Sequence, residues 1–187
     1  MKKQLLVIAL VTGLVLGLGA TAAQGASVEH ELEIVIPAVL MIRFVSSAGA
    51  PIVAANPVVF APTAAAITAG TEVFAPVSTA LNWANIEVFA NTRPGGFEVT
   101  VATNNDDFEW DKVSVTPAGG DLAVVAFDLP ANDELQIYAS GSSGVPASTG
   151  NQWQSLGISP ASYVLTLDGS EEEGADATTV TYTIADL

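Results

Sequence analysis

The most regular pattern in the chain is a strict alternation of apolar and polar residues near its beginning. Apolar side chains, with one histidine among them, occupy the even positions: Val28, His30, Leu32, Ile34, Ile36, Ala38, Leu40, Ile42 and Phe44. Glu29, Glu31 and Glu33 stand between the first of them. A period of two places the sets on opposite faces of an extended strand, one seeking an apolar sheet and one facing water. The stretch is too long for one strand and Pro37 cannot donate to a ladder, so we predict two strands, or one preceded by a projecting arm at residues 27–36.

Short alternating or apolar runs follow along the rest of the chain, separated by turn residues. The runs at 85–90 and 97–101 flank a turn rich in Asn, Pro and Gly, and this arrangement predicts a hairpin. Further strands are predicted at residues 112–116, 122–127, 135–139, 162–167 and 178–184. Residues 48–76 predict loops around one or two short strands, with a helical turn at 64–66 limited by flanking prolines. About nine short strands with almost no helical periodicity predict an all-β domain, folded as a single antiparallel β-sandwich or barrel.

The first residues of the chain are ordered like a secretory signal. Two lysines precede an apolar run, Leu5–Leu18, and small residues follow over 20–26. This three-part order predicts a signal peptide over residues 1–26, with the cut falling within Ala22–Ala26. The apolar run is shorter than the ~20 residues that span a bilayer. We therefore expect a secreted or extracytoplasmic protein, in the periplasm or at the cell surface, without membrane insertion of the mature chain.

The expected mature domain, residues 27–187, is strongly acidic and has no cysteine. It has three basic residues against 20 acidic ones, a formal charge of −17. Such a surface repels nucleic acid, so no nucleic-acid partner is expected. The absence of cysteine excludes disulfides, thiol catalysis and thiolate metal sites. Half of the residues are hydrophobic and only 13% are charged, a balance that predicts a folded domain.

Side chains suited to enzymatic chemistry are scarce. His30 is the single histidine and cysteine is absent, which excludes most catalytic triads and zinc sites. The chain has no nucleophile elbow, dinucleotide-binding turn or P-loop. Paired carboxylates could support glycoside hydrolysis, but the acidic residues fall in predicted turns or on wet strand faces. We therefore predict no enzymatic activity and no cofactor, with calcium as the one metal to consider.

The calcium candidate is a predicted turn crowded with oxygen-bearing side chains. Its members are Asn104, Asp106, Asp107, Glu109 and Asp111. Calcium takes roughly six to eight oxygen ligands from flexible loops, so the composition suits it. The order of residues does not match an EF-hand, and a solvated turn between strands is the alternative.

Trp153 is the candidate ligand platform. It stands between Gln152 and Gln154, next to a Gly/Ser-rich loop, and an exposed indole there could stack on a sugar. The alternative is that it fills or covers the core, which is the expectation for Trp83 and Trp110.

The two ends of the mature domain resemble subunits of the chaperone–usher pilin family. Gly174, Val180, Tyr182 and Ile184 stand fourteenth, eighth, sixth and fourth from the end, where such pilins have a glycine and alternating apolar residues. At the other end, the alternating arm follows the cleavage region directly. Asp186 stands where the family has a penultimate aromatic residue, and the cysteine pair is absent.

The resemblance implies a pilin-like or immunoglobulin-like Greek-key sandwich that assembles by strand donation. A sandwich lacking one strand exposes an apolar groove and unpaired backbone groups, which the arm of the next subunit fills. The partner-binding candidates are the groove-filling side chains Val28, His30, Leu32, Ile34 and Ile36. Head-to-tail contacts of this kind build open filaments. We therefore predict a structural or adhesive subunit that self-associates or binds a cell-envelope partner; the alternative is a monomeric extracellular binding module for carbohydrate or calcium.

Overall fold

Strands dominate the part of the chain that the computed structural model describes. The described residues are 39–69, 72–74, 81–91, 96–104, 112–140, 149–150, 152–169 and 177–187. They belong to one compact unit, residues 37–187. The predicted signal peptide, the arm at 27–36 and the loop at 105–111 therefore lie outside the described residues. Within the described ranges, no helix is long and apolar enough to cross a membrane.

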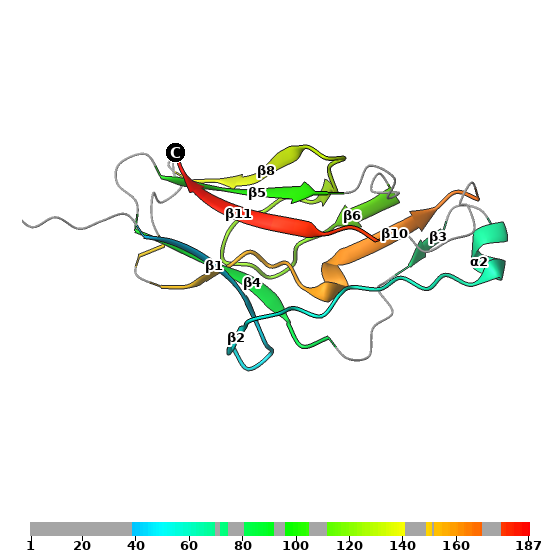
Figure 1. Ribbon diagram of the computed structural model, residues 1–187, viewed down its shortest axis with the longest axis horizontal. Helices are drawn as coiled ribbons and strands as arrows, with labels where there is room; N and C mark the ends of the chain where they lie inside the picture. The colour runs from blue at the N-terminus through cyan, green and yellow to red at the C-terminus, as the bar shows by residue number, and fades with distance from the viewer. Residues whose placement is uncertain are drawn as a thin grey trace, which may run out of the picture. The chain divides into compact units, whose positions relative to one another are not determined.

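The strands form three antiparallel sheets, which confirms the all-β class (Figure 1). The first sheet has the order β2-β1-β4-β9, with β1 at Leu40–Val45, β2 at Pro51–Ile52, β4 at Asn85–Ala90 and β9 at Gln154–Ser155. The second has the order β3-β10-β6-β7, with β3 at Glu72–Phe74, β6 at Val113–Val115, β7 at Phe127–Asp128 and β10 at Tyr163–Leu167. The third has the order β11-β5-β8, with β5 at Phe97–Thr103, β8 at Glu134–Ala139 and β11 at Val180–Asp186. A short helix, α2 at Ala64–Thr68, and a 3-10 turn, η2 at Pro160–Ser162, complete the described elements.

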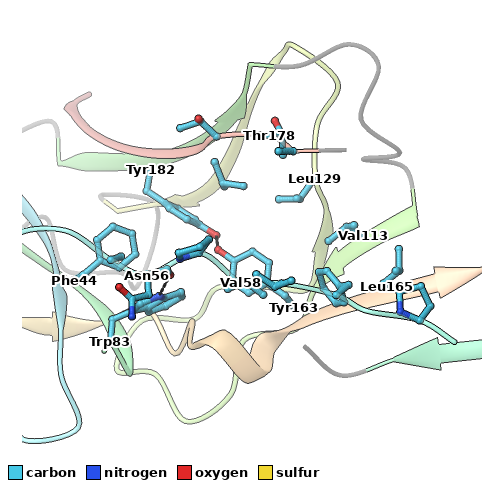
Figure 2. Close-up of a pocket in the computed structure, with 18 residues that line it drawn as sticks. Phe44, Asn56, Val58, Trp83, Val113, Leu129, Tyr163, Leu165, Thr178 and Tyr182 are labelled. Carbon is cyan, nitrogen blue, oxygen red and sulfur yellow. Dashed lines mark hydrogen bonds between the residues drawn. The ribbon is translucent and has the colours of Figure 1, made fainter. Parts of the chain in front are cut away.

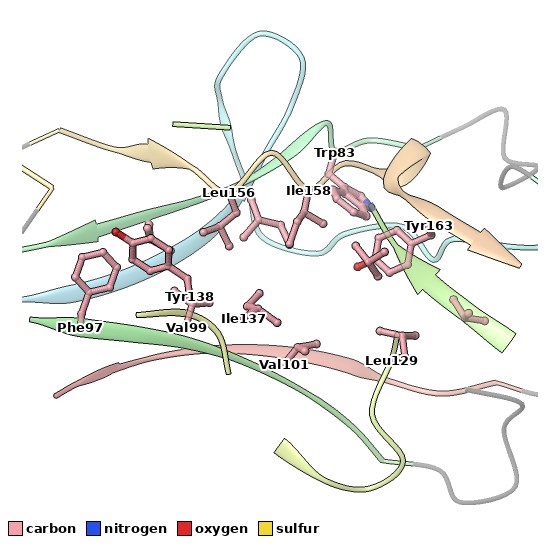
Figure 3. Packing of buried hydrophobic residues seen from close by; sticks show 14 of the residues in the cluster. Trp83, Phe97, Val99, Val101, Leu129, Ile137, Tyr138, Leu156, Ile158 and Tyr163 are labelled. Carbon is pink, nitrogen blue, oxygen red and sulfur yellow. The ribbon is translucent and has the colours of Figure 1, made fainter. Parts of the chain in front are cut away.

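The core lies where the apolar faces of β4 and β5 meet (Figure 3). Alternate residues of both strands are at most 1% exposed: Ile86, Val88, Ala90, Phe97, Val99 and Val101. Leu156 and Ile158, which follow β9, are fully buried in the same cluster. Each of the Val, Leu, Ile and Phe side chains among them contributes about 1.5–3 kcal/mol when it leaves water. Two facing layers with alternate residues buried between them are consistent with a β-sandwich.

The predicted hairpin of residues 85–90 and 97–101 is wrong, although both strands exist. β4 pairs with β1 and β9, whereas β5 pairs with β11 and β8. The two strands belong to different sheets and face each other across the core. An alternating strand must bury its apolar face against a second layer, and the chain meets this need by crossing to the other layer after β4.

The predicted strand at 122–127 is also largely wrong, because only Phe127 lies in a strand there. Val125 is 72% exposed. The backbone N–H groups of Asp121 and Leu122 both donate to Ser155 O, at 2.9 and 3.1 Å, so this stretch is attached to β9 at one point. The strands predicted at 112–116, 135–139, 162–167 and 178–184 are confirmed as β6, β8, β10 and β11. The helical turn at 64–66 is confirmed as part of α2, whose N-cap Thr63 accepts the Ala66 N–H at 3.2 Å.

Candidate functional site

β11 is an edge strand of the third sheet, and its backbone register shows which groups face outward. The N–H of Leu187 donates to Gly96 O at 3.1 Å, toward β5. At the other end, the N–H of Thr179 donates to Asn104 Oδ1 at 2.8 Å, again toward β5. Since backbone direction alternates along an antiparallel strand, the even residues of 180–186 direct their N–H and C=O groups away from β5. No strand among the described residues pairs with that side.

The even residues of β11 also point their side chains toward the core, yet they are only half buried. Val180, Tyr182 and Ile184 pack against the core cluster from the side. Their partners Val101 and Val99 on β5 are fully buried. The difference arises because β5 has neighbours on both sides and β11 has only one.

β1 comes near β11 on this side of the molecule (Figure 1). Its inward side chains, Leu40, Ile42 and Phe44, are half buried as well. β2 pairs only with Phe44 and Val45, so the first half of β1 has a second open edge among the described strands. Two incompletely covered strand edges therefore lie on the same side of the core.

A cavity of about 680 Å³ opens between the start of β11 and the irregular segment 55–62 (Figure 2). Its walls and floor combine apolar side chains from seven parts of the fold: Phe44, Val58, Phe60, Trp83, Val113, Leu129, Leu165 and Val180. Asn56, Thr178, Thr179, Tyr163 and Tyr182 supply the polar groups. None of the lining residues carries a formal charge at neutral pH. A volume of this size, mostly apolar and with few polar groups, is typical of a binding site.

Segment 55–62 is held in place as a wall of the cavity by two side chains. Trp83 donates its Nε1–H to Asn56 O at 3.0 Å. Asn82 accepts the Asn56 N–H at 2.8 Å and donates to Ala54 O at 2.8 Å. Trp83 is 5% exposed, as predicted for a core tryptophan, and its ring meets Phe44 edge-on with centroids 5.0 Å apart.

Two tyrosine hydroxyls meet inside this cavity (Figure 2). The hydroxyl oxygens of Tyr163 on β10 and Tyr182 on β11 are 2.6 Å apart, which joins the second sheet to the third. Burial raises the pKa of Tyr163 to about 12, and the hydrogen bond from Tyr182 opposes part of that rise. Burial also raises the pKa of Tyr182 well above its usual value, with the neighbouring Tyr163 adding to the effect. Both hydroxyls therefore stay protonated at neutral pH, and one of them donates to the other.

The tyrosine pair predicts a loss of stability in alkali. Tyrosines of the unfolded chain ionise near pH ~10, while those of the folded chain resist ionisation. The contribution of the pair to the free energy of unfolding is therefore fully present below pH ~10 and is lost as pH rises toward about 12. Tyr163 alone accounts for a loss of about 3 kcal/mol. Urea unfolding followed by circular dichroism across that range should show the fall. Tyr163→Phe should make the fall shallower but not remove it, because burial still raises the pKa of Tyr182. An equally steep fall in that variant would contradict the assignment.

Trp153, the predicted ligand platform, lies half buried on the outer face of the first sheet. The guanidinium carbon of Arg43 lies 3.7 Å from the centroid of its ring, and Phe89 packs against it at 5.7 Å between centroids. Arg43 also forms an ion pair with Glu87, its neighbour across the β1–β4 ladder, at 2.7 Å. The stacked guanidinium covers one face of the indole, so a sugar could stack there only by displacing Arg43.

The candidate calcium loop has one member within the described residues. Asn104 uses its Oδ1 to accept from the Thr179 N–H at 2.8 Å and from the Thr178 hydroxyl at 3.4 Å, linking the end of β5 to the start of β11. Asp106, Asp107, Glu109 and Asp111 lie outside the described ranges. Among the residues that are described, no three His, Asp or Glu side chains are grouped to hold a metal ion.

The cavity itself was not predicted from the sequence. Tyr182 was singled out in the alternating pattern of the last strand, but its hydroxyl partner Tyr163 was not. The two tyrosines are 19 residues apart in different sheets, and no local pattern relates them. No protein-family model, no curated protein and no solved structure matches this chain.

Proposed function

We propose that this chain is an exported structural or adhesive surface subunit, and that copies of it associate by strand donation. Residues 27–36 of one copy lie along the outer edge of β11 in the next copy. The observation that carries the proposal is this edge of β11. Its outward backbone groups pair with no described strand, and its inward side chains lie half buried next to an apolar cavity. The pilin-like Greek-key sandwich and the cleaved signal peptide at 1–26 belong to the same proposal and are supported by the sequence patterns.

The arm has the length and the pattern that the edge requires. Nine residues from 28 to 36 span roughly 30 Å when extended, which exceeds the seven residues of β11. A strand added there supplies backbone partners for residues 180–186 and covers their half-buried side chains. The apolar face of the arm turns toward the cavity, and Glu29, Glu31 and Glu33 remain in water.

Association of this kind is head to tail, because the donating arm and the accepting edge are different surfaces. Such contacts do not close on themselves unless the rotation between copies forms a ring, so they build filaments. Each mature copy carries a formal charge of −17, and like charges must approach. We therefore expect association to strengthen as salt screens the repulsion.

The test compares two double substitutions on opposite faces of the same arm. Leu32→Ser with Ile34→Ser removes apolar side chains meant for the cavity, and it should lower the association constant by at least ~100-fold, since each buried aliphatic side chain is worth about 1.5–3 kcal/mol. Glu31→Ser with Glu33→Ser changes only the outward face and should leave association intact or strengthen it. Sedimentation velocity on the purified chain measures the polymer distribution in each case.

The folded state needs its own readout so that loss of polymer is not confused with unfolding. Near-ultraviolet circular dichroism of the buried Trp83 should be the same in both variants. A wild-type chain that stays monomeric at all concentrations would overturn the proposal and leave a monomeric binding module for carbohydrate or calcium in its place. Equal loss of polymer in the two variants would show that the apolar face of the arm is not what binds.

A further inference from the structure

The tyrosine pair in the cavity has two O–H hydrogens, and the hydrogen bond between the two hydroxyls needs only one of them. Two hydroxyls, Tyr163 and Tyr182, contribute two O–H hydrogens, and the single bond between them at 2.6 Å consumes one. Neither hydroxyl has another hydrogen-bond partner among the described residues. Among the described residues, one O–H donor is therefore left without a partner, and it is available to a ligand that enters the cavity.

The other polar groups lining the cavity that the structure describes are engaged in hydrogen bonds or exposed to water. Asn56 O accepts from Trp83, and the Thr178 hydroxyl and the Thr179 backbone N–H donate to Asn104 Oδ1. Thr179 is exposed, so its hydroxyl can bond to water. The remaining lining is largely aliphatic and aromatic, and none of it is charged at neutral pH. An occupant matched to this cavity is thus an apolar segment that carries a single hydrogen-bond acceptor, because an unpaired buried donor costs about 1–3 kcal/mol.

The arm has that composition on its inward face. Of its five even residues, four are aliphatic and one, His30, is polar. A neutral imidazole has one nitrogen that accepts a hydrogen bond. The nitrogen of His30 is the only side-chain acceptor on this face of the arm. The tyrosine pair offers it a donor that has no other partner among the described residues.

We propose that His30 of one copy accepts a hydrogen bond from the Tyr163–Tyr182 pair of the next copy, and that this contact sets the register of the donated strand and makes association depend on pH. The inference rests on the proposed strand donation and adds to it a fixed alignment. A shift of the arm by one residue along β11 would turn the apolar face of the arm to water. A slip by two would place an aliphatic side chain against the hydroxyl pair and His30 against the apolar lining, so only one alignment satisfies every group.

The direction of the pH effect follows from the chemistry of imidazole. A protonated imidazole has no acceptor nitrogen, and an apolar cavity disfavours its charge, so the bound state lowers the pKa of His30 below its free value of about 6.5. Association is therefore at full strength above pH ~6.5 and weakens as the pH falls below it, by up to about ten-fold per pH unit. The titratable groups that line the cavity are Tyr163 and Tyr182, which stay protonated throughout this range.

Protonation of carboxylates changes the strength of association in the opposite direction, and at lower pH. Glu29 and Glu31 flank His30 on the arm but belong to its outward face. Their protonation near pH ~4.3 reduces repulsion between copies and strengthens association. A weakening between pH ~7.5 and ~5.5 is thus assigned to His30, the single histidine of the chain.

The experiment measures the association constant of the purified chain by sedimentation at about pH 7.5 and about pH 5.5. Wild type should weaken about ten-fold on acidification. His30→Gln, which retains an acceptor but does not titrate, should still associate and should show no such weakening. A double-mutant cycle between His30→Leu and Tyr163→Phe with Tyr182→Phe should show coupling of about 5- to 30-fold.

The outcomes separate this contact from the donation on which it rests. The histidine contact is overturned if wild type and His30→Gln associate with the same pH profile. It is also overturned if the effects in the double-mutant cycle are additive. Either result leaves strand donation standing. A chain that does not associate at any pH overturns both. A monomer whose own stability falls on acidification through His30 overturns the assignment to a second copy.

Discussion

Replacing Gly157 by alanine is expected to destabilise the fold by about 3–4 kcal/mol. The φ of Gly157 is +70°, a left-handed conformation that costs a residue with a Cβ roughly 1–2 kcal/mol. A Cβ at this position would lie 2.7 Å from the backbone nitrogen of Gly120 and 3.0 Å from Ala118 O. Neither is a side chain that can turn aside, so the backbone would shift, at a typical overpacking cost of about 1–3 kcal/mol.

The substitution at Gly157 would also disturb the core, because the residues on either side of Gly157 are core residues. Leu156 and Ile158 are both fully buried, and Ala118 N–H donates to Gly157 O at 2.8 Å. A backbone shift at Gly157 would strain that bond and displace two core side chains together. Urea unfolding followed by circular dichroism measures the change in free energy of unfolding.

Gly119→Ala is the matched control. Gly119 has φ +68°, but nothing lies within 4 Å of a Cβ added there. Gly119→Ala should lower the free energy of unfolding by about 1 kcal/mol, which is the cost of the left-handed backbone conformation alone. Equal losses in the two variants would mean that the close approach of residues 118–120 to Gly157 does not matter for stability.

Trp83→Ala is expected to cost about 3–5 kcal/mol and to enlarge the cavity beside β11. Trp83 is buried between Phe44 and Tyr163, with ring centroids 5.0 and 6.4 Å away. Its removal leaves a void that the surrounding side chains fill only in part. It also releases Asn56 O, and with it one attachment of the cavity wall.

Trp83→Phe separates the ring from the hydrogen bond. A phenyl ring retains most of the packing and loses the Nε1–H donor, so a cost of about 1–2 kcal/mol is expected. The free energy of unfolding of both variants is measured by urea titration. If Trp83→Ala proved no more costly than Trp83→Phe, the role of the ring in closing the core beneath segment 55–62 would be wrong.

Strand positions were predictable because alternation is a local property. The runs that became β4, β5, β8, β10 and β11 could be located within a residue or two, since side chains on a strand alternate between water and core. The strand predicted at 122–127 failed for the complementary reason. An apolar run can be a buried strand or a coil lying over the core, and a short run alone does not distinguish them.

Only the alternating strands of the candidate site were predictable from the sequence, and the cavity was not. The alternation of Val180, Tyr182 and Ile184, like that of residues 28–36, was visible in the sequence and suggested a subunit that assembles by strand donation. The cavity beside β11 was not visible, because Phe44, Trp83 and Tyr163 come from distant parts of the chain. The role of Trp153 also depends on an unforeseen contact, the guanidinium of Arg43 stacked on its ring.

By itself, the sequence determined that this protein is built of short antiparallel strands, that its exposed faces are strongly acidic, and that it has no cysteine chemistry. These properties follow from the spacing and identity of residues, which need no knowledge of distant contacts. Only the tertiary structure decided which strands lie side by side, because lateral pairing and face-to-face packing satisfy the same alternation. It is for this reason that β4 and β5 face each other across the core, that β11 is left at an edge, and that two tyrosines from different sheets share one hydrogen bond inside a cavity.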